Sequence, residues 1–154
     1  MSLRRVFGDE TWRLARSGDA PALHLAADLL RDGDPNAHGY DGHRARAFAL
    51  ALEGDLDGGL AELRAGRTDD WPFPAALAAD RTRVRYLAGD LERALEELRP
   101  AVRGVRRLDP EISDLVSALV VRAPQLRLRA VRLVLEGGTA WQRMRNAATT
   151  LAAR

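Results

Sequence analysis

The sequence predicts an all-α protein, a right-handed α-solenoid built from stacked helical hairpins. The dipeptide Gly-Asp begins at Gly18, Gly54 and Gly89, so its copies are separated by 36 and 35 residues, and each stands between two helical-looking stretches. A proline follows each copy at a similar distance, at Pro35, Pro72 and Pro110. A repeated helix-turn-helix unit cannot bury its apolar face alone, so successive units stack on one another.

Composition favours the same fold class. The chain has 154 residues, of which 46% are hydrophobic, and the apolar residues are mainly alanine and leucine with only 5% aromatic residues. Small and unbranched side chains favour close contacts between helices over sheets. The length suits one domain, residues 1–154, of about four short repeats. The chain contains no cysteine, which excludes disulfides and thiolate chemistry.

The two recurring signals divide the chain into helical hairpins. Glycine suits the left-handed turn that ends a first helix, and proline suits the place where the next unit begins. We therefore expect hairpin units at about residues 4–37, 40–72, 74–108 and 110–136, followed by a capping helix at about residues 139–153.

Apolar stripes mark the second helix of each hairpin. Leu91, Leu95, Leu98, Val102 and Val105 fall on one helical face and predict a single helix over residues 91–105. The same spacing recurs one and two units earlier, at Leu56, Leu60 and Leu63 and at Leu23, Ala27 and Leu30. Matching stripes support a true repeat.

Beyond Pro110 the pattern weakens but continues. A helical stripe ends near Ala123 and is formed by Ile112, Leu115, Val116, Leu119 and Val120. Pro124 follows where a fourth turn is expected, 35 residues after Gly89. The next helix carries Leu126, Val131, Val134 and Leu135 and is apolar around much of its circumference, so we expect it to be covered on several sides.

The last helix is expected to be a cap. Gly137 and Gly138 interrupt the preceding helix, and Thr139 is placed to act as the N-cap of the next one. One side of this helix is lined by Trp141, Met144, Ala148 and Leu151. A terminal helix with an apolar side and a polar back is typical of a solenoid cap.

These features together resemble the tetratricopeptide repeat, a helical hairpin of about 34 residues. Residues 84–98 match best, with the small Ala94 where the family packs its second helix tightly, and Gly59 occupies the same place one unit earlier. Ala47 supplies the small residue expected in the middle of a first helix. The segments Asp34-Pro35-Asn36 and Leu108-Asp109-Pro110 look like the family's closing Asp-Pro. The fourth unit departs from the pattern because it lacks Gly-Asp.

The resemblance implies a protein-protein interaction scaffold or adaptor whose first helices line a concave groove. Projected onto this chain, the peptide-binding groove is formed by Arg5, Trp12, Arg16, Arg44, Phe48, Arg83 and Tyr86. Arginine pairs with carboxylates through two parallel hydrogen bonds, so an acidic or C-terminal peptide is the expected ligand. In the alternative interpretation, Trp12 and Phe48 only fill the space between hairpins.

Charge is divided unevenly along the chain. All 24 basic residues are arginine, which is typical of a GC-rich bacterial genome, and the net charge is +2. Residues 1–80 hold 9 arginines and 14 acidic residues, a net charge of −5, whereas residues 122–154 hold 7 and 1, a net charge of +6. The predicted basic surface consists of Arg122, Arg129, Arg132, Arg143 and Arg145. It suits nucleic-acid phosphates, an acidic partner, or the acidic half of a second copy in a homo-oligomer.

We expect no enzymatic activity and no cofactor. The sequence has no glycine-rich phosphate loop, no serine in a nucleophile elbow and no cysteine nucleophile. His38, Asp41 and His43 offer a possible metal site, but we favour loop histidines beside Asp41 as the N-cap of the following helix.

Two further segments bear on partners and location. Trp71 and Phe73 stand between prolines and either fold back over the second hairpin or form a second contact surface. The first residues lack the apolar run of a signal peptide, and no stretch reaches the roughly 20 apolar residues that cross a bilayer. We therefore expect a soluble, cytoplasmic protein that does not bind membranes.

Overall fold

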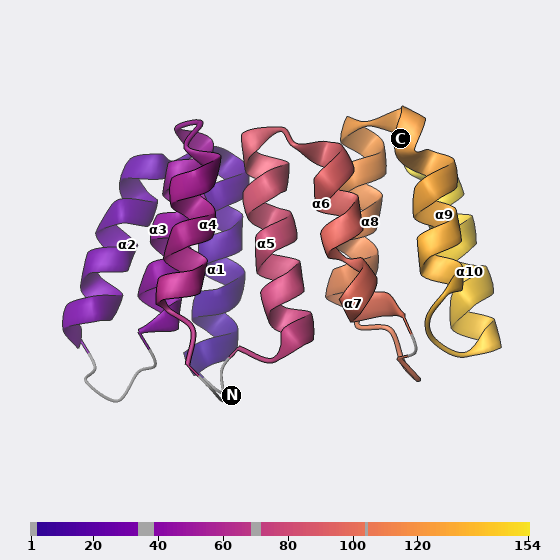
Figure 1. The fold of residues 1–154 in the computed structure, drawn as a ribbon, viewed down its shortest axis with the longest axis horizontal. Coiled ribbons are helices and arrows are strands. Elements are labelled where there is room, and N and C mark those ends of the chain that lie inside the picture. The colour runs from indigo at the N-terminus through magenta and orange to yellow at the C-terminus, as the bar shows by residue number, and fades with distance from the viewer. Residues whose placement is uncertain (1–2, 34–38, 69–71, 104) are drawn as a thin grey trace. The chain divides into compact units, whose positions relative to one another are not determined.

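All regular secondary structure is helical in the computed structural model, which describes residues 3–33, 39–68, 72–103 and 105–154 (Figure 1). This confirms the predicted all-α class. None of the described helices has both the length and the apolar character needed to cross a bilayer.

The chain forms two compact units. Unit 1 comprises residues 1–73 with 87–89, and unit 2 comprises residues 74–86 and 90–154. The helices in the first 73 residues are α1 (Leu3–Ser17), α2 (Ala20–Gly33), α3 (Tyr40–Leu52) and α4 (Leu56–Ala65). The later helices are α5 (Pro74–Ala88), α6 (Leu91–Glu97), α7 (Arg99–Val102), α8 (Pro110–Arg122), the 3-10 turn η1 (Pro124–Leu126), α9 (Arg127–Leu135) and α10 (Ala140–Ala152). The expectation of a single domain stays a prediction.

The three Gly-Asp turns have the backbone conformation that the sequence predicts. Gly18, Gly54 and Gly89 have φ angles of 78°, 90° and 85°, in the left-handed region that disfavours side chains. Asp55 then caps α4 by accepting a hydrogen bond from the backbone N–H of Gly58 over 2.8 Å. Asp19 accepts the equivalent hydrogen bond from the N–H of Ala22 over 3.0 Å, whereas Asp90 makes no such cap and pairs with Arg85 instead.

Replacing Gly54 by alanine is expected to lower the free energy of unfolding by about 1–2 kcal/mol, because an L residue is strained at positive φ. A Cβ at Gly54 would have no heavy atom within 4 Å, so the loss would come from the backbone alone. Gly39→Ala is the matched control, since Gly39 has a φ of −55° and equally open surroundings. Chemical denaturation measures both variants, and equal losses would contradict this explanation.

Unit 1 is organised around α3, which packs against both α2 and α4 (Figure 1). Small residues make this possible, because alanines let helix backbones approach closely. The predicted small residue Ala47 is fully buried, as are Leu23 of α2 and Leu63 of α4. Gly39 is the N-cap of α3, so the expectation that Asp41 caps this helix is wrong; Asp41 lies in the first turn.

In unit 2 the helix predicted over residues 91–105 is broken. Helix α6 ends at Glu97, and the short α7 runs from Arg99 to Val102, so Val105 lies outside any helix. Pro100 explains the break, because its ring lacks an N–H and collides with the carbonyl four residues earlier. Leu98 and Val102 nevertheless remain buried.

The fourth turn occurs where Pro124 predicts it. Helix α8 ends at Arg122, and Pro124 opens the 3-10 turn η1 that leads directly into α9. The predicted stripe of α8 is buried throughout: Ile112, Leu115, Val116, Leu119 and Val120. The expectation that α9 is covered on several sides is wrong, because Leu128 and Leu135 are exposed.

Helix α10 begins as the sequence predicts. The Thr139 hydroxyl accepts a hydrogen bond from the N–H of Gln142 over 3.3 Å, and the Gln142 side chain accepts one from the N–H of Thr139 over 3.2 Å. Gly137 precedes it at a close approach, since a Cβ there would lie 2.1 Å from the carbonyl oxygen of Val102. The turn between α9 and α10 is therefore held by the close approach of Gly137 to Val102 and by the capping box at Thr139. Helix α10 packs beside α9 (Figure 1).

Candidate interaction surface

The groove residues predicted in unit 1 form a packed cluster. Phe48 is fully buried, and the ring of Trp12 meets it edge-to-face with 5.8 Å between ring centroids. The guanidinium of Arg44, which is itself buried, lies 5.2 Å from the centroid of the Phe48 ring. Phe48 therefore fills the core, in agreement with the alternative interpretation, and is not placed to contact a peptide.

The two arginines predicted on α1 lie elsewhere. Arg16 is exposed, whereas the side chain of Arg5 lies outside the described part of the chain. Between them, Arg13 donates a hydrogen bond over 2.8 Å to Glu10, and this bond lowers the pKa of the exposed Glu10 carboxyl.

The groove residues predicted in unit 2 hold α5 against α8. Arg83 is buried and pairs with Asp80 at 2.9 Å and with Glu111 of α8 at 3.3 Å. Tyr86 is half-buried, and the guanidinium of Arg122 lies 4.9 Å from the centroid of its ring. Both predicted side chains therefore make structural contacts between helices.

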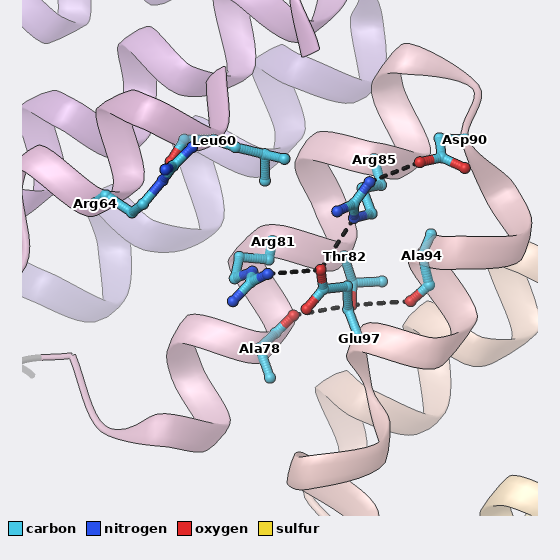
Figure 2. Close-up of polar contacts among 9 residues, drawn as sticks. All are labelled: Leu60, Arg64, Ala78, Arg81, Thr82, Arg85, Asp90, Ala94 and Glu97. Carbon is cyan, nitrogen blue, oxygen red and sulfur yellow. Dashed lines mark hydrogen bonds and ion pairs between the residues drawn. The ribbon is translucent and has the colours of Figure 1, made fainter. Parts of the chain in front are cut away.

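A second polar cluster joins α5 to α6 (Figure 2). Glu97 accepts hydrogen bonds from Arg81 over 2.9 Å and from Arg85 over 3.0 Å, and Arg85 also reaches Asp90 over 2.6 Å. The shallow hollow beside this cluster is lined by Arg85, Arg93, Glu96, Glu97 and Pro100. Its charges of both signs neutralise one another, so it offers no clear preference for a charged ligand.

The same figure shows the small residue of α6 in place. Ala94 is fully buried, and its carbonyl oxygen lies 3.1 Å from the hydroxyl oxygen of Thr82. That hydroxyl also lies 2.8 Å from the carbonyl oxygen of Ala78, so one proton is shared between two acceptors. A larger side chain at position 94 would prevent this close approach of α6 to α5.

The predicted basic surface separates into two groups. Arg122 donates a hydrogen bond to the carbonyl oxygen of Tyr86, and Arg129 pairs with Glu96 at 2.8 Å and with Glu92 at 3.4 Å. The remaining arginines are exposed and form no ion pair within the described part of the chain: Arg132, Arg143 and Arg145. Two of these three lie on α10.

Helix α10 exposes the side that the sequence predicts to be packed. Trp141, Met144 and Leu151 are 70%, 66% and 50% exposed. The packed side instead carries Asn146 and Thr150, both buried. The apolar stripe, defined here as Trp141, Met144, Ala148 and Leu151, therefore faces solvent, and the expectation of an inward apolar side is wrong.

This orientation of α10 lowers the stability of the isolated chain. The buried hydroxyl of Thr150 has no hydrogen-bond partner among the described residues, and an unsatisfied buried hydroxyl costs about 1–3 kcal/mol. Large apolar side chains on an exposed helix face are characteristic of a surface that another molecule covers. The apolar stripe of α10, with Arg143 and Arg145 beside it on the same helix, is the candidate interaction surface.

The two histidines that the structure describes form ordinary paired contacts. His43 lies 2.6 Å from Glu62, and His24 lies 3.0 Å from Glu53. His38, the third member of the alternative metal site, lies outside the described residues, as does Trp71 of the aromatic loop. Within the described part of the chain, no three histidine or carboxylate side chains are grouped as metal ligands. Phe73 is exposed.

The sequence does not reveal that the apolar stripe of α10 faces solvent, because amphipathicity identifies an apolar face without showing what covers it. A signal was present in the sequence, since Asn146, Ala147 and Thr150 make the opposite face small as well as polar. Such a face also permits close packing against another helix.

Comparison of the chain with protein-family models, with curated proteins and with solved structures finds no match.

Proposed function

We propose that the chain is a non-enzymatic protein-interaction module, a right-handed solenoid of tetratricopeptide-like hairpins. Left-handed glycine turns at the repeat period support the hairpin assignment. The buried Ala94 and Ala47, at the small-residue positions of the repeat, support the same family resemblance. In such modules function resides in a docking surface and requires no cofactor.

The observation that carries the proposal is the solvent-facing apolar stripe of α10. Trp141 and Met144 present large apolar side chains that are mostly exposed. Aromatic residues surrounded by arginine are enriched at the energetic centres of protein interfaces. We place the docking surface here rather than at Phe48 and Arg83, because both of those side chains are buried.

Nucleic-acid binding is the second candidate. Arg132, Arg143 and Arg145 are exposed and form no ion pair within the described residues, so they are free to approach phosphates. Binding of this kind depends on charge and weakens steeply as salt concentration rises. It would not require the apolar stripe.

One capture experiment separates the two candidates. The wild-type chain, the α10 variant Trp141→Glu/Met144→Glu and the control Phe73→Glu are used to capture proteins from cell extract, with and without nuclease, and the captured proteins are identified by mass spectrometry. The Phe73 side chain is also exposed and apolar, so Phe73→Glu controls for the loss of an exposed apolar side chain and also tests the second contact surface that the sequence offers at this residue. We expect a protein partner, which can be a second copy of the chain, to be captured by the wild type and by the control, to survive nuclease, and to be lost with the α10 variant.

Two results would contradict protein docking at α10. Equal capture by all three baits would remove the stripe from the binding surface. Capture that collapses with nuclease, whichever bait is used, would transfer the function to nucleic-acid binding through the arginines.

A further inference from the structure

We propose that the apolar stripe of α10 docks on helix α2 of a second copy of the chain, in a head-to-tail contact between two different surfaces. The inference rests on the proposed function, since it names the partner for the same stripe. Two observations carry it: a second unpartnered apolar face, on α2, and opposite charges on the units that bear the two faces.

Helix α2 presents its own exposed apolar pair. Leu25 and Leu29 are 62% and 65% exposed, and a spacing of four residues makes them neighbours on one helix face. The opposite side of α2 carries Leu23 and Ala27, which are buried. Helix α2 therefore has an inner apolar side that is packed and an outer apolar pair that is not.

The charges of the two units are complementary. Unit 1 contains 9 arginines and 13 acidic residues, a net charge of −4, whereas unit 2 contains 15 and 9, a net charge of +6. The residues beside the two faces follow this division. Arg145 lies one helical turn from Trp141 on a helix without acidic residues. Asp28, which is half-exposed and pairs with Arg46 at 2.9 Å, lies one turn from Leu25, so the acidic character of this side comes mainly from the net charge of unit 1.

Charge also selects between the possible pairings. Two α10 stripes brought together would oppose arginine with arginine within the basic unit, and like charges at an interface are unfavourable. Pairing α10 with α2 instead joins apolar to apolar and basic to acidic. After two copies have joined in this way, one α2 face and one α10 stripe remain unoccupied. Further copies can therefore add in succession.

Sedimentation equilibrium with two variants tests the contact. The α10 variant is Trp141→Glu/Met144→Glu, and the α2 variant is Leu25→Glu/Leu29→Glu. All four side chains are more than half exposed, so each substitution should change stability by no more than about 0.5 kcal/mol. Thermal unfolding of each variant checks this directly.

We expect the average mass of the wild type to rise with protein concentration. The rise should be smaller in 1 M salt, where the Debye length is only about 3 Å. Each variant alone should associate at least about 30-fold more weakly, because its substitutions remove residues from the interface centre. An equimolar mixture of the two variants should form a one-to-one dimer and nothing larger, since one intact α2 face and one intact α10 face remain.

Three outcomes would overturn the contact. The first is a wild-type chain that stays monomeric at every concentration. The second is association of the α2 variant alone as strong as that of the wild type, which would indicate pairing of α10 with α10. The third is a mixture of the two variants that stays monomeric. A monomeric wild type that still captures another protein through α10 would overturn this contact while leaving the proposed function intact.

Discussion

Replacing Phe48 with alanine is expected to lower the free energy of unfolding by about 3–5 kcal/mol. The ring is fully buried and meets both Trp12 and the guanidinium of Arg44. Its removal would leave a cavity at the centre of unit 1 and would also end the edge-to-face contact with Trp12. Chemical denaturation followed by circular dichroism measures the loss.

Phe73→Ala is the matched control for this measurement. The Phe73 side chain is exposed, so its truncation should change stability by no more than about 0.5 kcal/mol. If the two variants proved equally stable, Phe48 would not be a core residue of unit 1. The expected result also means that Phe48→Ala is unsuitable as a test of peptide binding, because a loss of binding would report loss of folding.

The second large effect is expected at Arg83. Arg83→Met should lower the free energy of unfolding by about 3–5 kcal/mol, because it removes the guanidinium that pairs with the buried carboxylate of Asp80. The double variant Arg83→Met/Asp80→Leu removes both charges and should recover most of the loss, since apolar side chains often replace a buried ion pair without penalty.

Arg143→Met is the control for Arg83. Arg143 is exposed and forms no ion pair within the described residues, so its replacement should change stability by less than about 0.5 kcal/mol. A double variant as unstable as Arg83→Met alone would show that the volume or hydrogen bonding of the arginine, rather than the charge pair, matters at this place.

Features encoded by local chemistry could be predicted from the sequence. The left-handed turn at Gly54, the turn at Pro124 and the N-cap at Thr139 each depend on a few neighbouring residues, and each occurs in the structure. Pro100 is also a local signal. The regular apolar stripe on both sides of Pro100 predicts one continuous helix instead. The residues of this stripe at Leu98 and Val102 are buried although the helix is broken.

Features that depend on distant packing could not be predicted in the same way. The sequence shows that Arg83 falls on a first helix, but not that Asp80 and Glu111 surround it. It likewise shows that Trp141 and Met144 share a face of α10, but not that Asn146 and Thr150 are the residues packed inward. Periodicity defines the faces of a helix, and only tertiary contacts decide which face is covered.

Because α3 packs against both α2 and α4, the unit that repeats in the sequence is smaller than the unit that folds. The repeat in the sequence pairs α3 with α4, yet α3 also packs against α2 across the repeat boundary, and its fully buried residues include Ala45, Ala47 and Ala49. A helix with so little exposed surface is stable only when both neighbours are present. The smallest part of unit 1 that folds cooperatively is therefore larger than one hairpin, and a single repeat excised at the sequence boundaries would lose the neighbour that completes it.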